Sequence, residues 1–577
     1  MEKKIHKTRL ILVFLFFITL QGLLLSRLIY LQIIKSVHLS KIADSQHKVL
    51  IELEPRRGTV YDRNMYKLAF NLNVDSVFAI PRDIDENQKP GIARRLANVL
   101  DLNEDFILER LRKKKGFVWI KRKISDEESQ QVKALKLKGI ELLKESKRLY
   151  PNGYLAAHVV GFAGLDNAGL EGVELLYDNY LKGRPGFRLT NRDAKRRFLP
   201  SKDERFLAPV NGFNLILNLD ETIQHIAEQA LDEAYKKYRA KGAVIIVMEP
   251  HTGEILAFAN RPTYDPNSFF DSTPDLRRNR GITDSFEPGS VFKIVTASCA
   301  LEKGGIGFQD KFFCENGKYW IAGHFLHDHQ PHGTLTFKEV IEKSSNIGTV
   351  KVAQRLARQD LYNYVRSFGF GNATGIDLKG EVEGTTYPPE KWSGTTISAL
   401  PIGQEVTVTA VQLACAISAI ANGGNMVKPW IVKEIKDDKG EVILSFSPTV
   451  VRRVISEETA KKAKEILKGV IEQGTGTLAK LESYTAGGKT GTAQKVEPSG
   501  VYSHSKFVGS FIGFAPVKDP RIAVVVCLDE PRPYYYGGVV AAPVFKKVAE
   551  NILRYLGVES DVKRTEQLKV VLNVQED

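Results

Sequence analysis

A strongly apolar run lies close to the N-terminus of the chain. Leu10 to Leu25 holds 16 residues without a charge. As a helix this run would be about 24 Å long, whereas the hydrocarbon core of a bilayer is about 30 Å thick. Continuing the helix to Ile34 gives about 37 Å, with Arg27 extending its charged end to the outer interface. The pattern therefore predicts a transmembrane anchor over residues 10–34.

The residues that flank this run predict its orientation. Segment 1–9 carries four basic side chains and one acidic side chain, and positive charge marks the cytoplasmic end of a membrane helix. We therefore expect a cytoplasmic tail at 1–9, a single pass, and the rest of the chain outside the cytoplasmic membrane, either extracytoplasmic or periplasmic. A cleaved signal peptide is the alternative, but Ser26 to Tyr30 offers no small-x-small cleavage site.

Residues 40–205 are predicted to form an elongated, non-catalytic pedestal domain. Stretches rich in Lys and Glu, such as Asp126 to Leu143, have the composition of helices. Turns with short strands are expected from Asn152 to Gly186. No nucleophile is paired with a base in this segment, so its expected role is to position the following domain and to contact partners.

After residue 220 the pattern changes to helices that alternate with apolar strands, which predicts a second domain over 220–556. A helix is expected from Glu221 to Arg239, and the turn Pro250–Gly253 indicates a hairpin between two apolar runs. The remaining expected elements are helices at Gln412–Ala421, Glu458–Glu472 and Ala542–Tyr555, and strands at Val244–Glu249, Glu254–Asn260, Thr485–Gln494, Phe507–Phe514 and Ile522–Leu528. Together they predict an α/β (α+β) domain, a mainly antiparallel sheet flanked by helices. Residues 557–577 are expected to form a charged C-terminal tail.

The tetrad Ser290-Val291-Phe292-Lys293 places a hydroxyl and an amine three residues apart, after a Pro288-Gly289 helix start. Positions i and i+3 of a helix share one face, with Cβ atoms about 5–6 Å apart, so Lys293 can reach the Ser290 hydroxyl. Lysine acts as a base only when it is neutral, and apolar neighbours can desolvate it and lower its pKa. Alone, such a tetrad also occurs by chance as a surface lysine after a capping serine.

Two further elements follow in the order that acyl transfer requires. Ser344-Ser345-Asn346 begins 54 residues after Ser290, and Lys489-Thr490-Gly491-Thr492 begins 199 residues after it. Ser344 can relay a proton between Lys293 and a leaving amine. The Asn346 amide can both donate to and accept from a substrate peptide bond. The three elements together predict a serine acyltransferase.

The Lys489 element is expected to bind the carboxylate of the substrate. Lys489 would supply a positive field that favours neutral Lys293 and attracts an anion. The hydroxyls of Thr490 and Thr492 can bind that carboxylate, and Gly491 lets a backbone strand approach the substrate closely. The backbone N–H groups of Ser290 and Thr492 are the predicted oxyanion hole.

These three elements resemble the signature of penicillin-binding proteins and serine β-lactamases. Nearly the whole chain resembles a class B penicillin-binding protein of the division type. The stretches that carry this wider resemblance are Arg57–Asn64, Gly169–Glu174, Tyr264–Asn267, Arg278–Arg280 and, for the division branch, Tyr536–Phe545. Ser345 departs from the family pattern, which more often has an aspartate there that points away from the substrate. The resemblance implies a transpeptidase domain preceded by a dimerisation-type pedestal and a membrane anchor.

The resemblance also implies a function, a membrane-anchored peptidoglycan D,D-transpeptidase of septal wall synthesis. Ser290 would attack the D-Ala-D-Ala bond of a stem peptide, release the terminal D-Ala, and pass the acyl group to an amine on a neighbouring stem. β-Lactam antibiotics would acylate the same serine. The implied partners are peptidoglycan stem peptides, lipid II-derived glycan strands, a SEDS-family glycosyltransferase similar to FtsW, other division proteins and the membrane. No cofactor is expected.

Several alternative functions remain open. An elongation-type class B protein of the lateral wall would share all three elements. A β-lactamase needs a base that hydrolyses the acyl-enzyme, and no Glu-x-x-Leu-Asn-like segment precedes Lys489. A β-lactam sensor needs a signalling domain before the binding domain, whereas nine residues precede the expected anchor here. A bifunctional class A protein needs a glycosyltransferase domain in the place of the pedestal, and no pattern resembling one is found there. A catalytically idle scaffold is distinguished only by its lack of activity.

Composition and charge agree with a large, ordered, extracytoplasmic protein. The chain has 577 residues with 43% hydrophobic content, which suffices for two or more packed domains. The net charge of +14 suits anionic cell-wall polymers, but it is spread along the chain, so nucleic acid is a poor candidate partner. The four cysteines form no Cys-x-x-Cys pair and are expected to be buried free thiols. They are Cys299, Cys314, Cys415 and Cys527.

Two other groups of residues could indicate a different chemistry. Histidines cluster with Asp328 in numbers that could hold zinc, but no cysteine or glutamate joins them. These histidines are His324, His327, His329 and His332. We expect a polar loop near the catalytic cleft, with no metal. The glycine-rich Gly474–Thr477 and Gly487-Gly488 lack the order of a phosphate-binding loop, so nucleotide binding is not expected.

Overall fold

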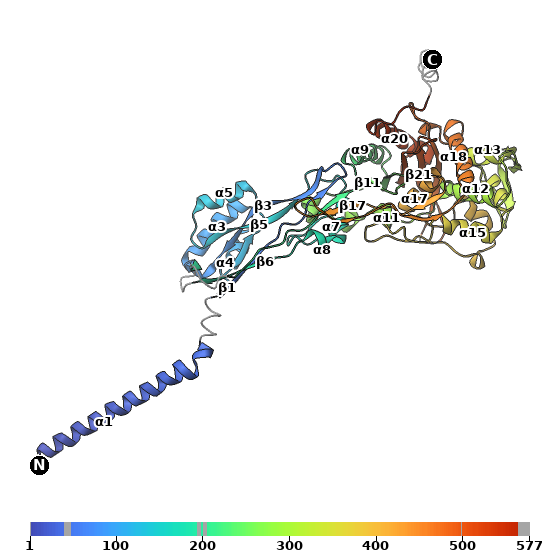
Figure 1. Cartoon of the computed structure of the whole chain (residues 1–577). Helices are drawn as coiled ribbons and strands as arrows, with labels where there is room; N and C mark the ends of the chain where they lie inside the picture. Colours follow the sequence, from blue (N-terminus) through green and yellow to red (C-terminus); the bar gives the residue numbers. More distant parts are fainter. Residues whose placement is uncertain (1, 40–47, 193–197, 200–204, 498, 563–577) are drawn as a thin grey trace. The chain divides into compact units, whose positions relative to one another are not determined.

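The computed structural model describes residues 2–39, 48–192, 198–199, 205–497 and 499–562 (Figure 1). The chain divides into two compact units. The first holds residues 1–56 and 183–211, and the second holds residues 57–182 and 212–577.

The first unit contains the predicted N-terminal helix and a small antiparallel sheet. The helix α1 (Glu2–Ile29) continues into the π-helical η1 (Tyr30–Ile34). Within the described part of the chain, His6–Ile34 is the one helix long and apolar enough to cross a membrane. In the small sheet, β6 pairs with each of the other three strands. The four strands of this sheet are β1 (Lys48–Leu53), β6 (Gly186–Arg192), β7 (Phe198–Leu199) and β8 (Arg205–Leu207).

A seven-stranded sheet runs through the second unit in the order β18-β17-β9-β2-β3-β4, with β5 also paired to β3. Its strands are β2 (Val60–Tyr61), β3 (Lys67–Ala79), β4 (Val118–Lys121), β5 (Ile140–Leu149), β9 (Asn214–Leu217), β17 (Val432–Lys436) and β18 (Val442–Ser445). The pairing of β2 with β9 is parallel, and the other pairings are antiparallel. Gly58 precedes β2 where a Cβ atom would lie 1.7 Å from the Phe213 carbonyl oxygen, so only glycine fits there.

Three helices pack near one end of this sheet and enclose a core of their own. They are α3 (Lys89–Leu100), α4 (Glu104–Leu111) and α5 (Asp126–Leu135). Apolar residues of these helices, such as Leu96 and Ile107, are buried with Val77 of β3. A Ser125 capping box begins α5, because Ser125 and Glu128 satisfy each other's backbone N–H groups.

Two predictions in the pedestal were wrong in detail. The helix predicted over Asp126–Leu143 ends at Leu135, because Lys136 adopts a left-handed conformation with φ of 43°. The chain then extends as β5 and pairs with β3 along its whole length. The segment predicted to hold short strands between Asn152 and Gly186 forms three short helices instead. They are α6 (Ala157–Val160), α7 (Gly172–Leu176) and α8 (Asp178–Leu181).

Buried ion pairs explain why short helices are stable there. Arg57, 1% exposed in its side chain, contacts the carboxylates of Glu174 and Asp178 at 2.6 Å each. Arg148 donates to the other oxygen of Glu174 at 2.7 Å. Such charges are seldom buried unless paired, so the pairs fix α7 and α8 against the strand that follows Arg57.

The catalytic region is built on a five-stranded antiparallel sheet in the order β11-β10-β22-β21-β20. Its strands are β10 (Gly242–Met248), β11 (Ile255–Arg261), β20 (Gly487–Val496), β21 (Tyr502–Ala515) and β22 (Ile522–Asp529). The predicted hairpin and the three predicted closing strands are confirmed, and β20 forms one edge of the sheet. Every residue of β10 and β11 is buried, which agrees with helices on both faces.

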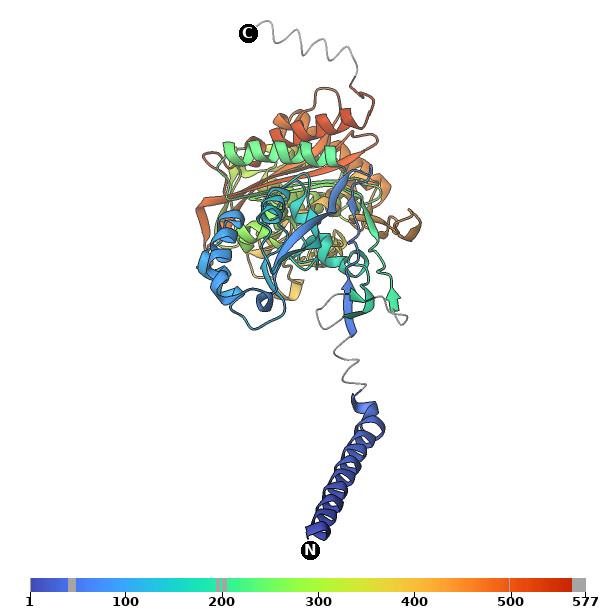
Figure 2. The same ribbon diagram turned by 90° about the vertical axis from the view of Figure 1, so that its left-hand side faces the viewer.

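The two faces of this sheet are covered by different helices (Figures 1 and 2). On one face, α9 (Glu221–Lys237) and α20 (Ala542–Tyr555) lie side by side and share a core with the sheet. On the other face lies the larger core that includes α12 (Lys293–Glu302) and α17 (Ala410–Ala421). This arrangement confirms the predicted fold, a mainly antiparallel sheet flanked by helices.

The four cysteines are buried and free, as predicted. Burial raises the pKa of the Cys299 thiol and of the Cys527 thiol to about 12. The thiolate is the reactive form of cysteine, so these two side chains serve as small apolar groups of the core.

Candidate active site

Ser290 lies in a short 3-10 turn, η5 (Gly289–Phe292), which leads directly into α12. Gly289 adopts a left-handed conformation with φ of 57°, and a Cβ atom there would lie 2.9 Å from the Thr492 carbonyl oxygen. Glycine therefore permits both the sharp turn and the close approach of β20 to the serine. The sequence prediction of a helix start at Pro288-Gly289 is confirmed.

Lys293 is completely buried at the first position of α12. Its Nζ donates to the Ser344 carbonyl oxygen at 2.7 Å, to Asn346 Oδ1 at 2.8 Å and to Ser344 Oγ at 3.3 Å. Burial lowers the pKa of Lys293 to about 7, although the charge of Asp328 acts in the opposite direction. An amine with this pKa is partly neutral at neutral pH, as a general base must be.

Lys489 is also completely buried, on β20. Its Nζ donates to Ser344 Oγ at 2.9 Å and to the Thr490 carbonyl oxygen at 3.2 Å. Burial lowers the pKa of Lys489 well below its usual value, and the nearby charge of Lys293 lowers it further. The Ser344 hydroxyl therefore lies between two buried amines from two different elements.

The Ser344-Ser345-Asn346 element forms the turn before α14 (Asn346–Ala353). Ser344 has a left-handed backbone with φ of 58°, which is rare outside glycine and costs strain. Ser345 caps the helix, because its hydroxyl accepts from the Gly348 N–H at 2.9 Å. Asn346 uses both ends of its amide, accepting from Lys293 and donating to the His327 carbonyl oxygen at 3.0 Å.

Asp328 is a site residue that sequence reasoning did not assign. Its carboxylate accepts from the Ser345 hydroxyl at 2.6 Å and from the Ile347 N–H at 2.9 Å. It holds the turn that carries Ser344, and its charge favours protonated Lys293. The carboxylate that contacts position 345 therefore comes from a separate loop. Its sequence position gave no indication of this contact.

The glycine of the third element is required by packing. A Cβ atom on Gly491 would lie 2.4 Å from Ser510 Oγ and 2.8 Å from Val291 Cγ1. The absence of a side chain at Gly491 therefore lets β20 pack closely against Val291, the residue that follows Ser290. Thr492 Oγ1 accepts from the Gly537 N–H at 3.1 Å, which joins β20 to α19 (Gly537–Val540).

A cavity of about 850 Å³ opens over these elements. Residues from all three motifs line it, together with two groups that sequence reasoning missed, Thr475 and the pair Tyr535 and Tyr536. The motif residues in its wall are Ser290, Ser344, Ser345, Asn346, Thr490 and Thr492. Thr475 Oγ1 lies 2.7 Å from Thr490 Oγ1, so these two hydroxyls form a polar pair at the cavity wall. Gly474 and Thr477 also line the cavity, so this glycine-rich segment is part of the site.

The histidine cluster lies on the β14 (His324–His327) hairpin and the loop after it. His329 and His332 line the cavity, and the His329 ring packs 4.8 Å from the Tyr536 ring. Within the described residues, no group of three or more His, Cys, Asp or Glu side chains is arranged to hold a metal ion. The loop is polar and adjoins the cleft.

The arrangement suits acyl transfer. Ser290 and the Ser344 hydroxyl line one cavity, and two fully buried lysines, Lys293 and Lys489, contact that hydroxyl. The cavity is bounded by β20, an edge strand whose backbone can pair with an extended peptide. These groups can activate a hydroxyl nucleophile and return its proton to a leaving group.

Comparison with known proteins agrees with this geometry. Residues 243–550 match the family described as penicillin binding protein transpeptidase domain, and residues 52–217 match the penicillin-binding protein dimerisation domain.

Individual relatives match over almost the whole chain. Stage V sporulation protein D of Bacillus subtilis is 37% identical, covering 96% of this chain and 86% of that protein. Peptidoglycan D,D-transpeptidase FtsI of Escherichia coli is 32% identical, covering 94% and 91%. The crystal structure of penicillin binding protein 3 from Mycobacterium tuberculosis, complexed with aztreonam, matches with a TM-score of 0.70 at 29% identity, covering 89% of this chain and 98% of that one.

Proposed function

The chain belongs to the class B penicillin-binding proteins of the FtsI type, which are serine D-Ala-D-Ala transpeptidases of peptidoglycan, and we propose that Ser290 is the residue that carries the acyl group. The observation that supports this assignment most strongly is the Ser344 hydroxyl, held between Lys293 and Lys489. That arrangement connects a base beside the nucleophile to a proton donor for the leaving group.

The acylation step follows from these positions. Neutral Lys293 accepts the proton of the Ser290 hydroxyl while Ser290 Oγ bonds to the carbonyl carbon of the penultimate D-Ala. The backbone N–H groups of Ser290 and Thr492 stabilise the oxyanion that forms. The proton passes through Ser344 to the nitrogen of the terminal D-Ala, the C–N bond breaks, and D-Ala leaves.

Deacylation runs these steps in reverse, with the amine of the acceptor in the place of the D-Ala that has left. The amine of a neighbouring stem peptide loses a proton through Ser344 and attacks the ester carbon, and Ser290 regains its proton from Lys293. Asn346 positions the peptide backbone, whereas the hydroxyls of Thr490 and Thr492 bind the terminal carboxylate. β-Lactams acylate the same serine because their strained amide occupies the position of the D-Ala-D-Ala bond.

Labelled penicillin tests the assignment of the nucleophile. The wild type should form a covalent adduct that maps to Ser290, and Ser290→Ala should form none. Ser285→Ala, a neighbouring serine outside the catalytic cavity, is the matched control and should label normally. A mutant Ser290→Ala that is still labelled would remove Ser290 from this role.

The cellular role that we propose is septal wall synthesis during division. The relatives named FtsI and stage V sporulation protein D support it. Elongation-type synthesis of the lateral wall is the second candidate. Accumulation of a fluorescent fusion at mid-cell would support the septal role. Fluorescence distributed evenly along the lateral wall would contradict it.

We further propose that α1 anchors the chain by a single pass, with residues 1–9 in the cytoplasm and the catalytic region outside. The apolar helix and the basic residues before it support this orientation. A polytopic SEDS glycosyltransferase similar to FtsW is the proposed membrane partner, on family resemblance. Protease added to intact spheroplasts should digest the region after the anchor and spare a tag at the N-terminus.

A further inference from the structure

A third threonine adjoins Thr490 and Thr492, the two residues whose hydroxyls are assigned to the substrate carboxylate. Thr475 is exposed at the wall of the catalytic cavity, in the loop that follows α18 (Glu457–Glu472). Its Oγ1 atom lies 2.7 Å from Thr490 Oγ1, a normal length for a hydrogen bond between two hydroxyls. Thr475 belongs to none of the three catalytic motifs.

Glu342, at the end of α13 (Phe337–Glu342), holds the loop that carries Thr475. Its backbone carbonyl oxygen accepts from the Thr475 N–H at 3.3 Å, and its side-chain Oε2 accepts from Gln473 Nε2 at 3.2 Å. The Glu342 side chain is almost completely buried. Because Glu342 lies two residues before Ser344, these bonds tie the Thr475 loop to the turn that presents Ser344.

Three glycines make room for this arrangement. A Cβ atom on Gly469 of α18 would lie 1.7 Å from Glu342 Oε1, and one on Gly474 would lie 2.3 Å from the Glu342 carbonyl oxygen. On the other side of the loop, a Cβ atom on Gly538 of α19 would lie 2.8 Å from the Thr475 carbonyl oxygen. Close packing on both sides therefore fixes the backbone of Thr475.

A hydroxyl group has a single hydrogen, so it can donate to the substrate only if its neighbours donate to it. Thr492 Oγ1 accepts from the Gly537 N–H at 3.1 Å, which leaves the Thr492 hydrogen for the substrate carboxylate. A backbone N–H acts only as a donor, so the direction of that bond is fixed. The Thr490 hydroxyl needs an equivalent donor if its own hydrogen is to point into the cavity.

We propose that Thr475 is a positioning residue of the carboxylate site, and that its hydroxyl donates to Thr490 when substrate is bound. An anion in the cavity attracts the hydrogens of both hydroxyls, so the pair aligns as a chain from Thr475 through Thr490 to the carboxylate. Lys489 Nζ also donates to Thr490 Oγ1, at the long distance of 3.5 Å, and favours the same direction. The proposal rests on the proposed function, in which Thr490 and Thr492 bind the carboxylate of the donor peptide.

The role of Thr475 is one of specificity, because it concerns the charge at the end of the substrate. A hydrogen bond to a charged acceptor is stronger than one to a neutral acceptor, and a hydroxyl polarised by a second hydroxyl is a stronger donor. A carboxylate therefore gains more from the pair than a neutral carboxamide gains. Loss of the Thr475 hydroxyl should reduce the preference for a carboxylate and affect a carboxamide much less.

Steady-state hydrolysis of two thioester substrates by the full chain in detergent tests this role. The substrates share one acyl group, and their leaving groups end either in a carboxylate or in the matched carboxamide. The ratio of the two kcat/KM values is the carboxylate preference. Thr475→Val keeps the shape of the side chain but lacks the hydroxyl, so it should lower this preference about three- to tenfold. Thr475→Ser should restore most of it.

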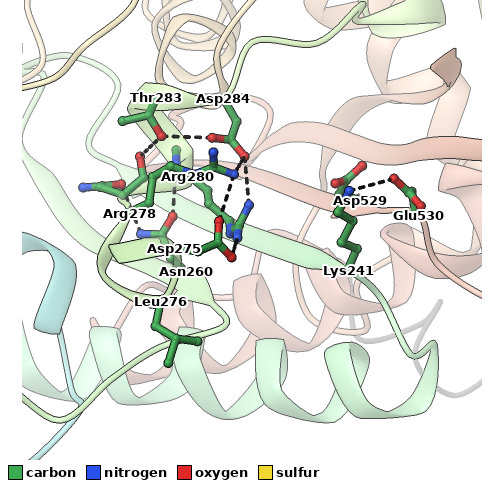
Figure 3. Close-up of polar contacts among 12 residues, drawn as sticks. Lys241, Asn260, Asp275, Leu276, Arg278, Arg280, Thr283, Asp284, Asp529 and Glu530 are labelled. Carbon is green, nitrogen blue, oxygen red and sulfur yellow. Dashed lines mark hydrogen bonds and ion pairs between the residues drawn. The ribbon is translucent and has the colours of Figure 1, made fainter. Parts of the chain in front are cut away.

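Thr283→Val is the matched control, because it also removes a threonine hydroxyl from a polar network. Thr283 Oγ1 donates to Asp284 Oδ1 at 2.9 Å, and Asp284 contacts Arg278 and Arg280 at 3.2 Å each (Figure 3). None of these four residues is among the described residues that line the catalytic cavity. Thr283→Val should therefore keep the wild-type carboxylate preference, even if it lowers thermal stability.

Three results would overturn the proposal. They are an unchanged carboxylate preference in Thr475→Val, an equal loss with both substrates, which would indicate a general disturbance of the cleft, and a Thr475→Ser variant that behaves like Thr475→Val.

Penicillin labelling of the same preparations separates this proposal from the proposed function. A wild type that is labelled on Ser290, together with a Thr475→Val variant that keeps its carboxylate preference, would contradict only the role of Thr475. A wild type that is not labelled on Ser290 would contradict the proposed function, and the role of Thr475 with it.

Discussion

The Ser345 hydroxyl donates a 2.6 Å hydrogen bond to the carboxylate of Asp328, a residue 17 positions earlier in the chain. The same carboxylate accepts from the Ile347 N–H. Asp328, in the loop after β14, therefore holds the turn that presents Ser344. Its negative charge also raises the pKa of Lys293.

Replacing Asp328 by Asn should shift the pH dependence of acylation to lower pH. The negative charge of Asp328 raises the pKa of Lys293, so its removal should lower that pKa below about 7. The measurement is the rate of penicillin acylation against pH. Asp438→Asn, in an exposed turn, is the control and should keep the wild-type midpoint. An unshifted midpoint in Asp328→Asn would mean that its charge does not act on the base.

The wild-type acylation rate should rise with pH through a midpoint near 7. Burial lowers the pKa of Lys293 to about 7, so the base is protonated and idle below this pH and neutral above it. Lys293→Arg should acylate at least about a hundredfold more slowly at every pH, because arginine stays charged. Lys303→Arg, an exposed change just after α12, should behave as wild type. A pH-independent rate in the wild type would contradict Lys293 as the base.

Ser344→Ala should slow the reaction of a D-Ala-D-Ala peptide by about 10²- to 10⁴-fold. The change removes the hydroxyl that contacts Lys293 and Lys489, and with it the proton path to the leaving amine. A thioester analogue has a leaving group that needs no proton, so its reaction should fall less. Steady-state kinetics with both substrates give the comparison, and equal losses would argue against a relay.

Gly491→Ala should impair acylation because its Cβ atom would collide with Ser510 Oγ and Val291 Cγ1. Overpacking of this kind costs about 1–3 kcal/mol in stability. It should also push β20 away from the serine and slow penicillin acylation by about tenfold or more. Stopped-flow fluorescence measures the rate, and thermal unfolding measures stability. Gly307→Ala has open space around it and should change neither quantity.

Glu174→Gln should destabilise the protein by about 3–5 kcal/mol, because it leaves two buried arginines without their shared anion. Arg57 and Arg148 both contact this carboxylate at 2.6 Å. Thermal unfolding is the measurement, with Glu109→Gln as the control. Glu109 pairs with Lys113 on an exposed helix face, and its loss should cost less than about 1 kcal/mol. Equal effects of the two changes would contradict the structural role of the buried cluster.

The meeting of Lys293, Ser344 and Lys489 could be predicted because three short motifs in this order resemble the signature of a known family. Asp328 could not be predicted in the same way. Its contact with Ser345 depends on a hairpin that folds back over α14, and no local pattern encodes that return.

In the fold, too, elements set by local sequence could be predicted, whereas elements set by distant contacts could not. The strongly apolar strands of the catalytic sheet were predicted, because burial on both faces leaves a continuous apolar run. The predicted helix included Ile140–Leu143, the first part of β5, because charged residues favour helix locally and only the pairing with β3 makes this segment a strand. Of the short helices after Asn152, α7 and α8 are held by the distant Arg57 and could not be predicted from their own composition.

The seven-stranded sheet has a mechanical consequence. Strands β2 and β3 belong to the dimerisation-type region, whereas β17 and β18 belong to the transpeptidase region, and β9 pairs with β2 on one side and β17 on the other. A load applied to β3 would therefore reach β17 through paired backbones instead of a flexible linker. Within this unit, pulling the two regions apart along the sheet would have to break the pairing of β2 with β9 or that of β9 with β17.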